Sequence, residues 1–275
     1  MLTKIEARSP AGELLSLPLD DFSGGFVVAD VLGVDPVKAT IVTSPIATID
    51  GAHLQTTRRE SRNLILKLEY APDYSSESIR DLRFRLYEFF MPETTVNLRF
   101  IHSIGDDFEV EINGVVETFD APLFTKEPKV DISIICTDPD FVVLEDVVVE
   151  GDTDPDPDEL LIAYPGTVEA GLVLTMTIPH DDLEMDVYLR GPDGITRAFR
   201  FAVNCLEDDI LTINSIPGSK EITLTRAGTP FSILYSVYQP TPWPTLWKGN
   251  NYIRVVVDGD PIPYTITYKP KYGGL

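Results

Sequence analysis

The chain of 275 residues carries 44 acidic against 22 basic residues, a formal net charge of -22 at pH 7. Its hydrophobic share of 43% excludes intrinsic disorder, and the acidic balance excludes a surface that grips nucleic acid through clustered cations. Two cysteines, Cys136 and Cys205, are too few for a disulfide scaffold, and we expect neither a secretory leader nor a membrane span, hence synthesis in the cytoplasm.

Apolar and polar residues alternate with a period of two along most of the first half, a pattern that predicts β-strands. These strands are expected at residues 64–70, 96–100, 108–112, 115–119 and 131–136. The pair Asn113-Gly114 stands between two of them. Because both central residues of a tight hairpin turn need positive φ, this pair predicts an exposed hairpin.

One segment of the first half has helical spacing instead. Its apolar residues recur every three or four positions: Ile79, Leu82, Leu86 and Phe89. Ser75 or Ser76 is placed to cap the first turn, and Pro92 to end the run. The sequence therefore predicts one amphipathic helix over residues 77–90, laid on a sheet by its apolar stripe.

An acidic, proline-rich stretch divides the chain. Residues 151–159 read Gly-Asp-Thr-Asp-Pro-Asp-Pro-Asp-Glu, and alternating Asp and Pro neither donate nor bury enough to form a regular element. We therefore predict a first domain at 1–145, an acidic linker or loop at 146–160, and a second domain at 161–275.

The second half is expected to contain strands alone, joined by turns at residues 191–194 and 217–218. The strands are predicted at residues 172–178, 185–189, 198–203, 210–213, 221–225, 231–238, 252–257 and 264–268. Short alternating strands without a helix are typical of a β-sandwich. The fold class is therefore mainly β.

The sequence offers little for catalysis. None of the common nucleophile, phosphate-loop or zinc-protease motifs is present, and the histidines His53, His102 and His180 lack metal-ligand spacing. Among 44 carboxylates chance pairs are expected, so an acidic glycosidase is only a third hypothesis. We predict no enzyme, no catalytic residue, no cofactor and no metal site.

One acidic segment has the spacing of a calcium-binding loop. Asp152, Asp154 and Asp156 imitate the first ligands of a D-x-D-x-D loop. However, Pro157 stands where the turn needs glycine and Ala163 where the last ligand needs Glu. The pattern fails as an EF-hand loop.

Both tryptophans, Trp243 and Trp247, lie in one proline-rich segment. Exposed tryptophan on a β-sandwich can stack on sugar rings, whereas buried tryptophan covers the end of a sandwich core. These two residues are the candidate glycan contacts. They support the alternative hypothesis of a carbohydrate-binding, lectin-like adhesin.

Several blocks of sequence stand out together along the chain: residues 44–52, 62–66, 79–82, 87–92, 114–119, 123–127, 132–141, 246–251 and 272–275. In this order they resemble the distal tail proteins of siphophages. The resemblance covers roughly residues 40–141 and the C-terminal end. Residues 150–240 match less recognisably.

The resemblance implies a virion protein of the phage tail tip, made in the host cytoplasm. Such proteins form a hexameric ring that joins the tail tube to the baseplate. The first domain would form a β-sandwich-like ring with one α-helix, and the second a galectin-like or carbohydrate-binding-module-like β-sandwich. The implied partners are copies of the chain itself, the tail tube protein, a tail-tip lysin or fibre hub protein, and receptor-binding proteins.

A ring needs complementary side surfaces on each subunit. We expect them at the hairpin of Asn113 and Gly114 and at the segment containing Arg58, Arg59 and Arg62, where guanidinium groups would bind carboxylates of the next subunit. Because the chain is acidic, we also expect an electronegative lumen that lets DNA pass without specific binding.

Overall fold

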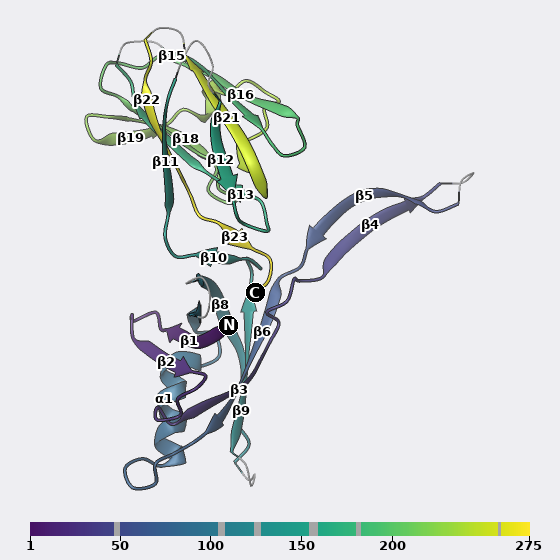
Figure 1. Cartoon of the computed structure of the whole chain (residues 1–275), viewed down its shortest axis with the longest axis vertical. Helices are drawn as coiled ribbons and strands as arrows, with labels where there is room; N and C mark the ends of the chain where they lie inside the picture. The colour runs from purple at the N-terminus through teal and green to yellow at the C-terminus, as the bar shows by residue number, and fades with distance from the viewer. Residues whose placement is uncertain (47–49, 104–107, 124–127, 154–158, 180–182, 258–259) are drawn as a thin grey trace. The chain divides into compact units, whose positions relative to one another are not determined.

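The computed structural model describes residues 1–46, 50–103, 108–123, 128–153, 159–179, 183–257 and 260–275. It divides into two compact units: unit 1 comprises residues 1–144 with 273–275, and unit 2 comprises residues 145–272. The fold is mainly β, as predicted (Figure 1). In the described part of the chain, no helix has the length and apolar character needed to cross a membrane.

Unit 1 is built on one antiparallel sheet in the order β2-β1-β7-β8-β9-β6-β3, with β10 paired to β8. Its strands are β1 (Leu2–Arg8), β2 (Leu14–Pro18), β3 (Phe26–Leu32), β4 (Ala39–Pro45), β5 (Ala52–Arg59), β6 (Arg62–Tyr70), β7 (Thr95–His102), β8 (Phe108–Asp120), β9 (Lys129–Cys136) and β10 (Phe141–Val143). Strands β4 and β5 pair only with each other.

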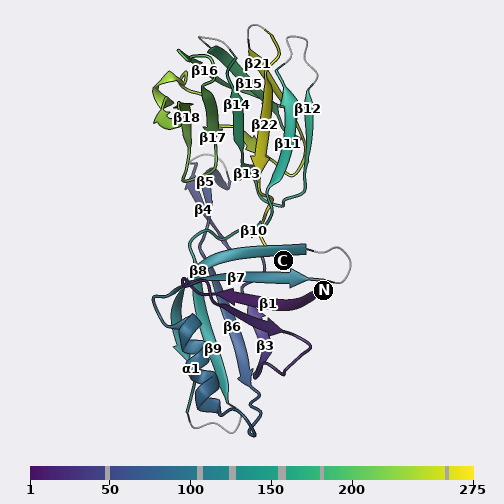
Figure 2. The same cartoon turned by 90° about the vertical axis from the view of Figure 1, so that its left-hand side faces the viewer.

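The single helix of unit 1, α1 (Ile79–Phe90), lies against this sheet (Figure 2). Leu82, Leu86 and Phe90 are fully buried on its inner side. The first turn is capped by Ser78 rather than by the predicted Ser75 or Ser76. The Ser78 hydroxyl accepts a hydrogen bond from the backbone N–H of Asp81, and the Asp81 carboxylate accepts one from the backbone N–H of Ser78. The predicted helix is therefore confirmed, with the cap moved to Ser78.

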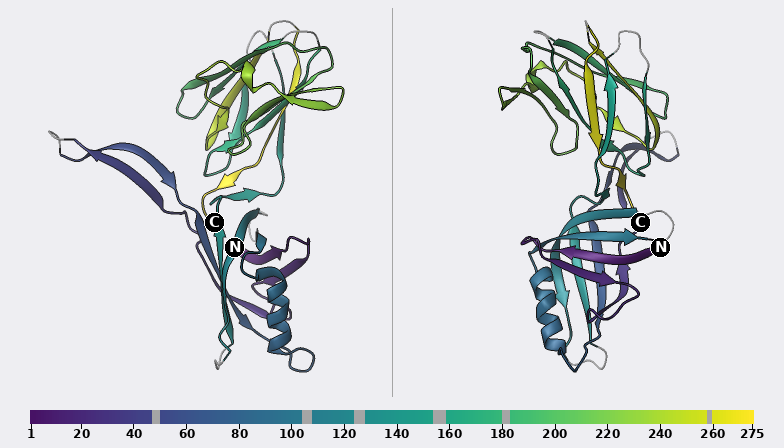
Figure 3. Two further views of the ribbon diagram at one scale, coloured as in Figure 1. Left: turned by 180° about the vertical axis from the view of Figure 1, so that it is seen from behind. Right: turned by 60° about the vertical axis from the view of Figure 1, so that its left-hand side comes forward.

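Unit 2 is a sandwich of two sheets, in the orders β11-β22-β14-β17-β18-β19 and β12-β21-β15-β16 (Figure 3). Its elements are β11 (Val147–Asp152), β12 (Leu160–Tyr164), β13 (Ala170–Gly171), β14 (Val173–Thr177), β15 (Leu183–Arg190), β16 (Thr196–Val203), β17 (Ile210–Asn214), β18 (Glu221–Arg226), β19 (Thr229–Ser232), the 3-10 turn η1 (Leu234–Ser236), β20 (Thr245–Leu246), β21 (Gly249–Val257), β22 (Pro263–Tyr268) and β23 (Lys271–Tyr272).

The core of unit 2 is filled from both sheets. Leu174, Ile213 and Ile266 come from the first sheet, and Val187 and Phe201 from the second. Each is at most 1% exposed. Alternation along the strands places their sequence neighbours on the solvent face, which explains the period-two pattern.

Three local predictions are wrong. Residues 147–152 of the expected linker form β11 and pair with β22, because Val147 and Val149 pack against the core; residues 154–158 lie outside the described residues. The strand predicted at residues 231–238 is also wrong. The strand β19 ends at Ser232, and the 3-10 turn η1 follows it.

The predicted hairpin at Asn113-Gly114 is also absent, because β8 runs without interruption through both residues. Gly114 lies opposite Val96 on β7, deep in the sheet. A Cβ on Gly114 would stand 2.5 Å from Ile134 Cγ2 and 2.9 Å from Cys136 Sγ. Glycine is needed here for close packing rather than for a turn.

Replacement of Gly114 by alanine should therefore destabilise unit 1 by about 1–3 kcal/mol, the usual effect of overpacking a core. Gly24→Ala is the matched control, since no atom lies within 4 Å of a Cβ at that position. Chemical denaturation followed by circular dichroism measures both. Equal stability of the two variants would contradict the packing role of Gly114.

Candidate assembly surface

The hairpin of β4 and β5, taken from Lys38 to Arg59 and called the arm, is exposed along most of its described length. It leaves the main sheet of unit 1 as a two-stranded ribbon (Figures 1 and 3). All eight residues of β5 are exposed, and so are five of the seven in β4. A two-stranded ribbon exposed on both faces gains little from burial within its own chain, so it is suited to contact another molecule.

Apolar side chains stand on this arm. Ile41 is 62% exposed and Leu54 55% exposed. The register pairs Ile41 with Thr57 and Thr43 with Leu54, so Ile41 and Leu54 point to the same face. Covering such a side chain with a partner stabilises an assembly by about 1.5–3 kcal/mol.

The arm also differs from the rest of the chain in charge. Residues 38–59 contain three basic residues, Lys38, Arg58 and Arg59, against one acidic residue, Asp50. The arm therefore carries +2, whereas the remaining residues carry -24. An acidic protein surface is its natural electrostatic complement, and another copy of the chain supplies one.

The arm is fixed at its root by polar contacts. Arg59 Nη2 donates to Asp140 Oδ2 at 2.9 Å, and Arg59 Nη1 donates to Asp140 Oδ1. The Asp140 carboxylate is buried, and the Arg59 guanidinium supplies the positive charge that stabilises it there. On the opposite side of the root, Thr40 Oγ1 donates to Glu60 Oε1 at 2.6 Å.

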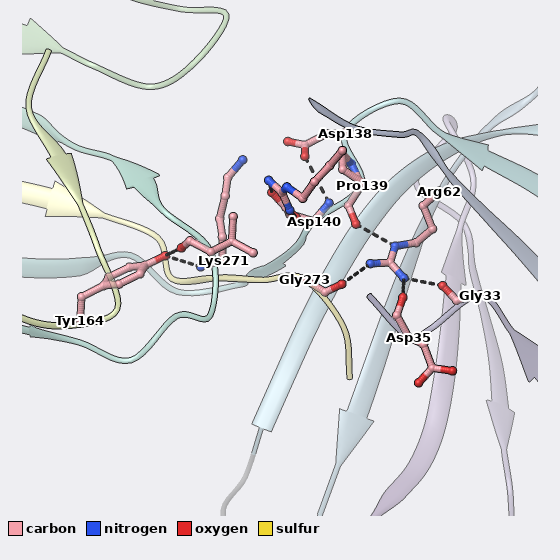
Figure 4. Close-up of polar contacts among 11 residues, drawn as sticks. Gly33, Asp35, Arg62, Asp138, Pro139, Asp140, Tyr164, Lys271 and Gly273 are labelled. Carbon is pink, nitrogen blue, oxygen red and sulfur yellow. Dashed lines mark hydrogen bonds and ion pairs between the residues drawn. The ribbon is translucent and has the colours of Figure 1, made fainter. Parts of the chain in front are cut away.

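The strongest contact at the root is made by Arg62, at the start of β6 (Figure 4). Its Nε donates to Pro139 O at 2.7 Å and its Nη2 to Gly273 O at 2.6 Å. Its Nη1 donates to Asp35 O at 2.7 Å and to Gly33 O. The guanidinium thus ties three separate chain segments to β6.

Arg62 is 1% exposed, and its guanidinium lies 4.5 Å from the ring centre of Phe141. Burial lowers the pKa of Arg62 below its ordinary value, although an arginine remains a cation at neutral pH. Four carbonyl dipoles and an aromatic face replace the water that this cation loses. The prediction that Arg62 binds a neighbouring subunit was wrong, because its own chain surrounds it.

Arg58 and Arg59 differ from Arg62 in that they remain accessible. They line a hollow of about 480 Å³ at the arm root, together with Glu60, Ser61 and Thr137. Arg58 is exposed, and no ion pair joins it to another residue in the described part of the chain. The hollow is therefore able to receive a carboxylate at Arg58.

The other predicted contact residues lie elsewhere. Asn113 is exposed on β8, where its side-chain Oδ1 accepts from Asn97 Nδ2 at 3.0 Å, and Gly114 is buried in the sheet. Neither forms a loop tip. Both belong to β8 and neither lies on the arm that carries Arg58 and Arg59.

The two tryptophans of unit 2 are half-buried against its core. The ring of Trp243 packs 5.1 Å from that of Phe199, and Arg197 lies 4.4 Å from the ring centre of Trp247. A Cβ on Gly191 would be 2.8 Å from Trp247 Cε3. Phe199 and Arg197 thus cover part of the two rings, which leaves less of their surface for stacking on a sugar.

Few groups in the described residues are poised for chemistry. Burial raises the pKa of the Cys136 thiol to about 11, so it is a neutral, poor nucleophile. Burial also lowers the pKa of His102. No cluster of three metal-ligating side chains occurs among the described residues; Asp154 and Asp156 of the weighed calcium loop lie outside them.

The arm itself was missed by the sequence analysis, although a signal for it exists. Residues 39–44 and 56–57 are rich in β-branched side chains, and the pair Asp50-Gly51 stands between them. Gly51 has a φ of 104°. An Asp-Gly pair between β-branched runs predicts a hairpin, but without an apolar stripe it escapes a search for period two.

Comparison with known proteins shows which solved structures share this fold. No family model and no curated protein sequence matches the chain. A crystal structure of the Dit protein of phage SPP1, described as a paradigm of the hub adsorption apparatus in phages infecting Gram-positive bacteria, aligns at a TM-score of 0.67 and 15% identity. The alignment covers 97% of this chain and 98% of that one.

Two structures of the phage P2 baseplate in its activated conformation, with calcium and with strontium, align at TM-scores of 0.44 and 0.42. Each is 11% identical; the alignments cover all of this chain and 100% and 99% of the other chains. The alignment with SPP1 Dit confirms the expected distal-tail-protein fold across both units.

Replacement of Arg62 by methionine, which is apolar and of similar length, should destabilise unit 1 by about 3 kcal/mol or more. The variant loses the four hydrogen bonds that Arg62 donates to main-chain carbonyls, and hydrogen bonds to a charged group contribute about 1.5–3 kcal/mol each. The matched control is Arg58→Met at the exposed root of the arm, for which a change within about 0.5 kcal/mol is expected.

Urea denaturation measures this effect with an internal reference. Both tryptophans lie in unit 2, so their fluorescence follows unit 2, whereas circular dichroism follows both units. We expect Arg62→Met to lower the midpoint by circular dichroism and to leave the fluorescence midpoint unchanged. A loss as small as that of Arg58→Met would show that Arg62 does not hold the arm root.

Proposed function

We propose that this chain is the distal tail protein of a siphophage, a structural subunit of the tail tip rather than an enzyme. The observation that carries the proposal is the alignment with SPP1 Dit, which spans nearly the full length of both chains at a TM-score of 0.67. A match of both units in one order is more specific than a shared sandwich, a fold that many unrelated proteins adopt.

In this proposal, six copies form a ring through unit 1, and the arm of one copy lies on the next copy. The exposed Ile41 and Leu54 and the charge of +2 on the arm support this contact, because the rest of each copy is acidic. Arg58 binds a carboxylate of the neighbour in the hollow at the arm root. Arg59 aids this contact only indirectly, since it already binds Asp140.

The ring would connect the tail tube protein to a tail-tip lysin or fibre hub protein and to receptor-binding proteins. Unit 2 is proposed to serve the outward contacts and unit 1 the ring. A free lectin-like adhesin based on Trp243 and Trp247 is less well supported, because both rings pack against the core of unit 2.

Multi-angle light scattering tests the ring. The wild-type chain is expected as a particle of six times the 30.6 kDa chain mass. The double variant Ile41→Asp/Leu54→Asp should remain a folded monomer, since both side chains are exposed and a carboxylate cannot be buried in the contact without a large penalty. Arg58→Glu should shift the particle mass in the same direction.

The matched controls lie in unit 2. The double variant Leu161→Asp/Ile195→Asp changes two side chains that are 50% and 56% exposed, respectively, and Lys248→Glu reverses one exposed charge. These variants should keep the wild-type mass. A wild-type chain that stays monomeric at high concentration, or arm variants that assemble normally, would refute the arm-mediated ring.

The proposal also includes an electronegative lumen, since each copy carries -22. We expect purified protein to leave the mobility of duplex DNA in a native gel unchanged at low salt, where electrostatic attraction to DNA is strongest. A retarded band would mean that cations line a surface accessible to DNA, and it would contradict this part of the proposal.

A further inference from the structure

One lateral side of unit 2 is strongly acidic. Strands β11 and β12 end the two sheets there, and each pairs with a single neighbour. Residues 145–161, which include β11 and the start of β12, contain eight acidic residues and neither lysine nor arginine. Glu150 and Asp152 are exposed on β11, and Val148, two residues before Glu150, is 57% exposed. Alternation along the strand places these three side chains on one face, which we call the acidic side.

The opposite lateral side of unit 2 is formed by residues 229–238. Strand β19 pairs with β18 at the other end of the first sheet, and Val237 forms a bridge with Phe201 of β16 at the other end of the second sheet. Figure 2 shows β11 and β12 along one side of the sandwich and β16 and β18 along the other. The two lateral sides therefore face away from each other within one unit.

This second side exposes large apolar and aromatic side chains, which we call the aromatic side. Phe231 is 40%, Leu234 46%, Tyr235 84% and Tyr238 51% exposed. The acidity of the rest of the chain is missing here, because residues 222–257 contain three basic residues and no acidic one. Soluble proteins seldom expose several such side chains together, and Phe and Tyr are enriched where proteins meet. The aromatic side is therefore suited to contact another protein surface.

Hydrogen-bond donors stand beside these rings. Val237 and Phe201 form a bridge and are both buried, so alternation along the two segments turns Tyr238 and Arg200 outward together. The Arg200 side chain is 51% exposed, and its Nε lies 3.3 Å from Asp186 Oδ2. A guanidinium has five N–H donors, and one carboxylate does not use all of them. The tyrosine hydroxyls and Arg200 are thus able to donate to carboxylates of a partner.

The two sides match each other in chemistry. The acidic side offers carboxylates and an apolar side chain, and the aromatic side offers donors and apolar rings. Pro230 removes one N–H from β19, so a partner meets side chains there rather than extending the sheet. Nucleic acid and anionic membranes are disfavoured as partners, because residues 145–272 carry a net charge of -11. Another copy of unit 2 presents the complementary surface.

We propose that the aromatic side of unit 2 binds the acidic side of unit 2 in a second copy of the chain, head to tail. The contact involves few side chains, so it is weak between free copies. It does not require the arm. If unit 1 forms the proposed ring, the ring raises the local concentration of unit 2 and strengthens the contact. Only this last step rests on the proposed function.

Analytical ultracentrifugation of the arm variant Ile41→Asp/Leu54→Asp tests the contact without the ring. We expect this variant to be monomeric at the dilution of the light-scattering experiment. At about 1 mM, which half-saturates even a weak contact, it should associate reversibly. An arm variant that stays monomeric at this concentration would overturn the proposal.

Charge reversal in the arm variant locates the contact. Tyr235→Asp/Tyr238→Asp sets carboxylates against the acidic side, and Glu150→Arg/Asp152→Arg sets cations against Arg200. Each change alone should raise the dissociation constant by about tenfold or more. A mixture of the two should associate again, because the new carboxylates of one copy meet the new guanidinium groups of the other. Unchanged association of either variant, or a mixture that stays monomeric, would overturn the proposal.

The matched control is Ile195→Asp/Ile216→Asp, again in the arm variant. These side chains are 56% and 36% exposed in the loops that join β15 to β16 and β17 to β18, away from both sides, so association should persist. Circular dichroism checks that every variant is folded. A hexameric wild type with an arm variant that never associates would overturn this contact and leave the ring. A wild type that is monomeric in light scattering, with an arm variant that associates near 1 mM, would refute the ring and support this contact.

Discussion

The structure of unit 1 depends on one buried cation. Arg62 carries its charge into a site that is 1% exposed, where an unpaired guanidinium would be strongly destabilising. Among the described residues no carboxylate bonds to it directly; four main-chain carbonyls do. Because carbonyl oxygens cannot rotate away as a side chain can, their positions must be fixed together. This one guanidinium therefore sets the path of the segments around residues 33–35, the turn at Pro139, and the returning C-terminal end.

That constraint explains why an exposed arm can leave the sheet in a defined way. The arm begins after the segment held through Gly33 and Asp35 and ends three residues before Arg62. Leu275 N–H donates to Val34 O at 3.1 Å, so the last residues of the chain reinforce the same segment. Because the arm has no hydrophobic core of its own, the polar contacts at its root fix its position. Rigidity there reduces the entropy that a partner must overcome when it binds the arm.

The sequence predicted local structure well and long-range structure poorly. The helix was legible, because Leu82 and Leu86 mark one face and a serine begins it. Gly114 was misread, since an Asn-Gly pair predicts a turn and only the approach of Ile134 reveals a packed strand. The burial of Arg62 had no local signal: one acceptor lies 211 residues away in the chain.

In the proposed ring, the net charge of the copies makes them repel one another, whereas the arm contact attracts them. A net charge of -22 repels at long range, but in physiological salt this repulsion fades over about 8 Å. In the proposed ring, the arm brings a charge of +2 and exposed apolar side chains, Ile41 and Leu54 among them, so its contact is attractive at short range, where the repulsion between whole copies is screened. Free copies thus avoid random association, because most encounters oppose acid to acid. In the proposed ring, an approach that sets an arm against an acidic face would bring attraction and apolar burial together, and that geometry would favour an ordered assembly over an aggregate.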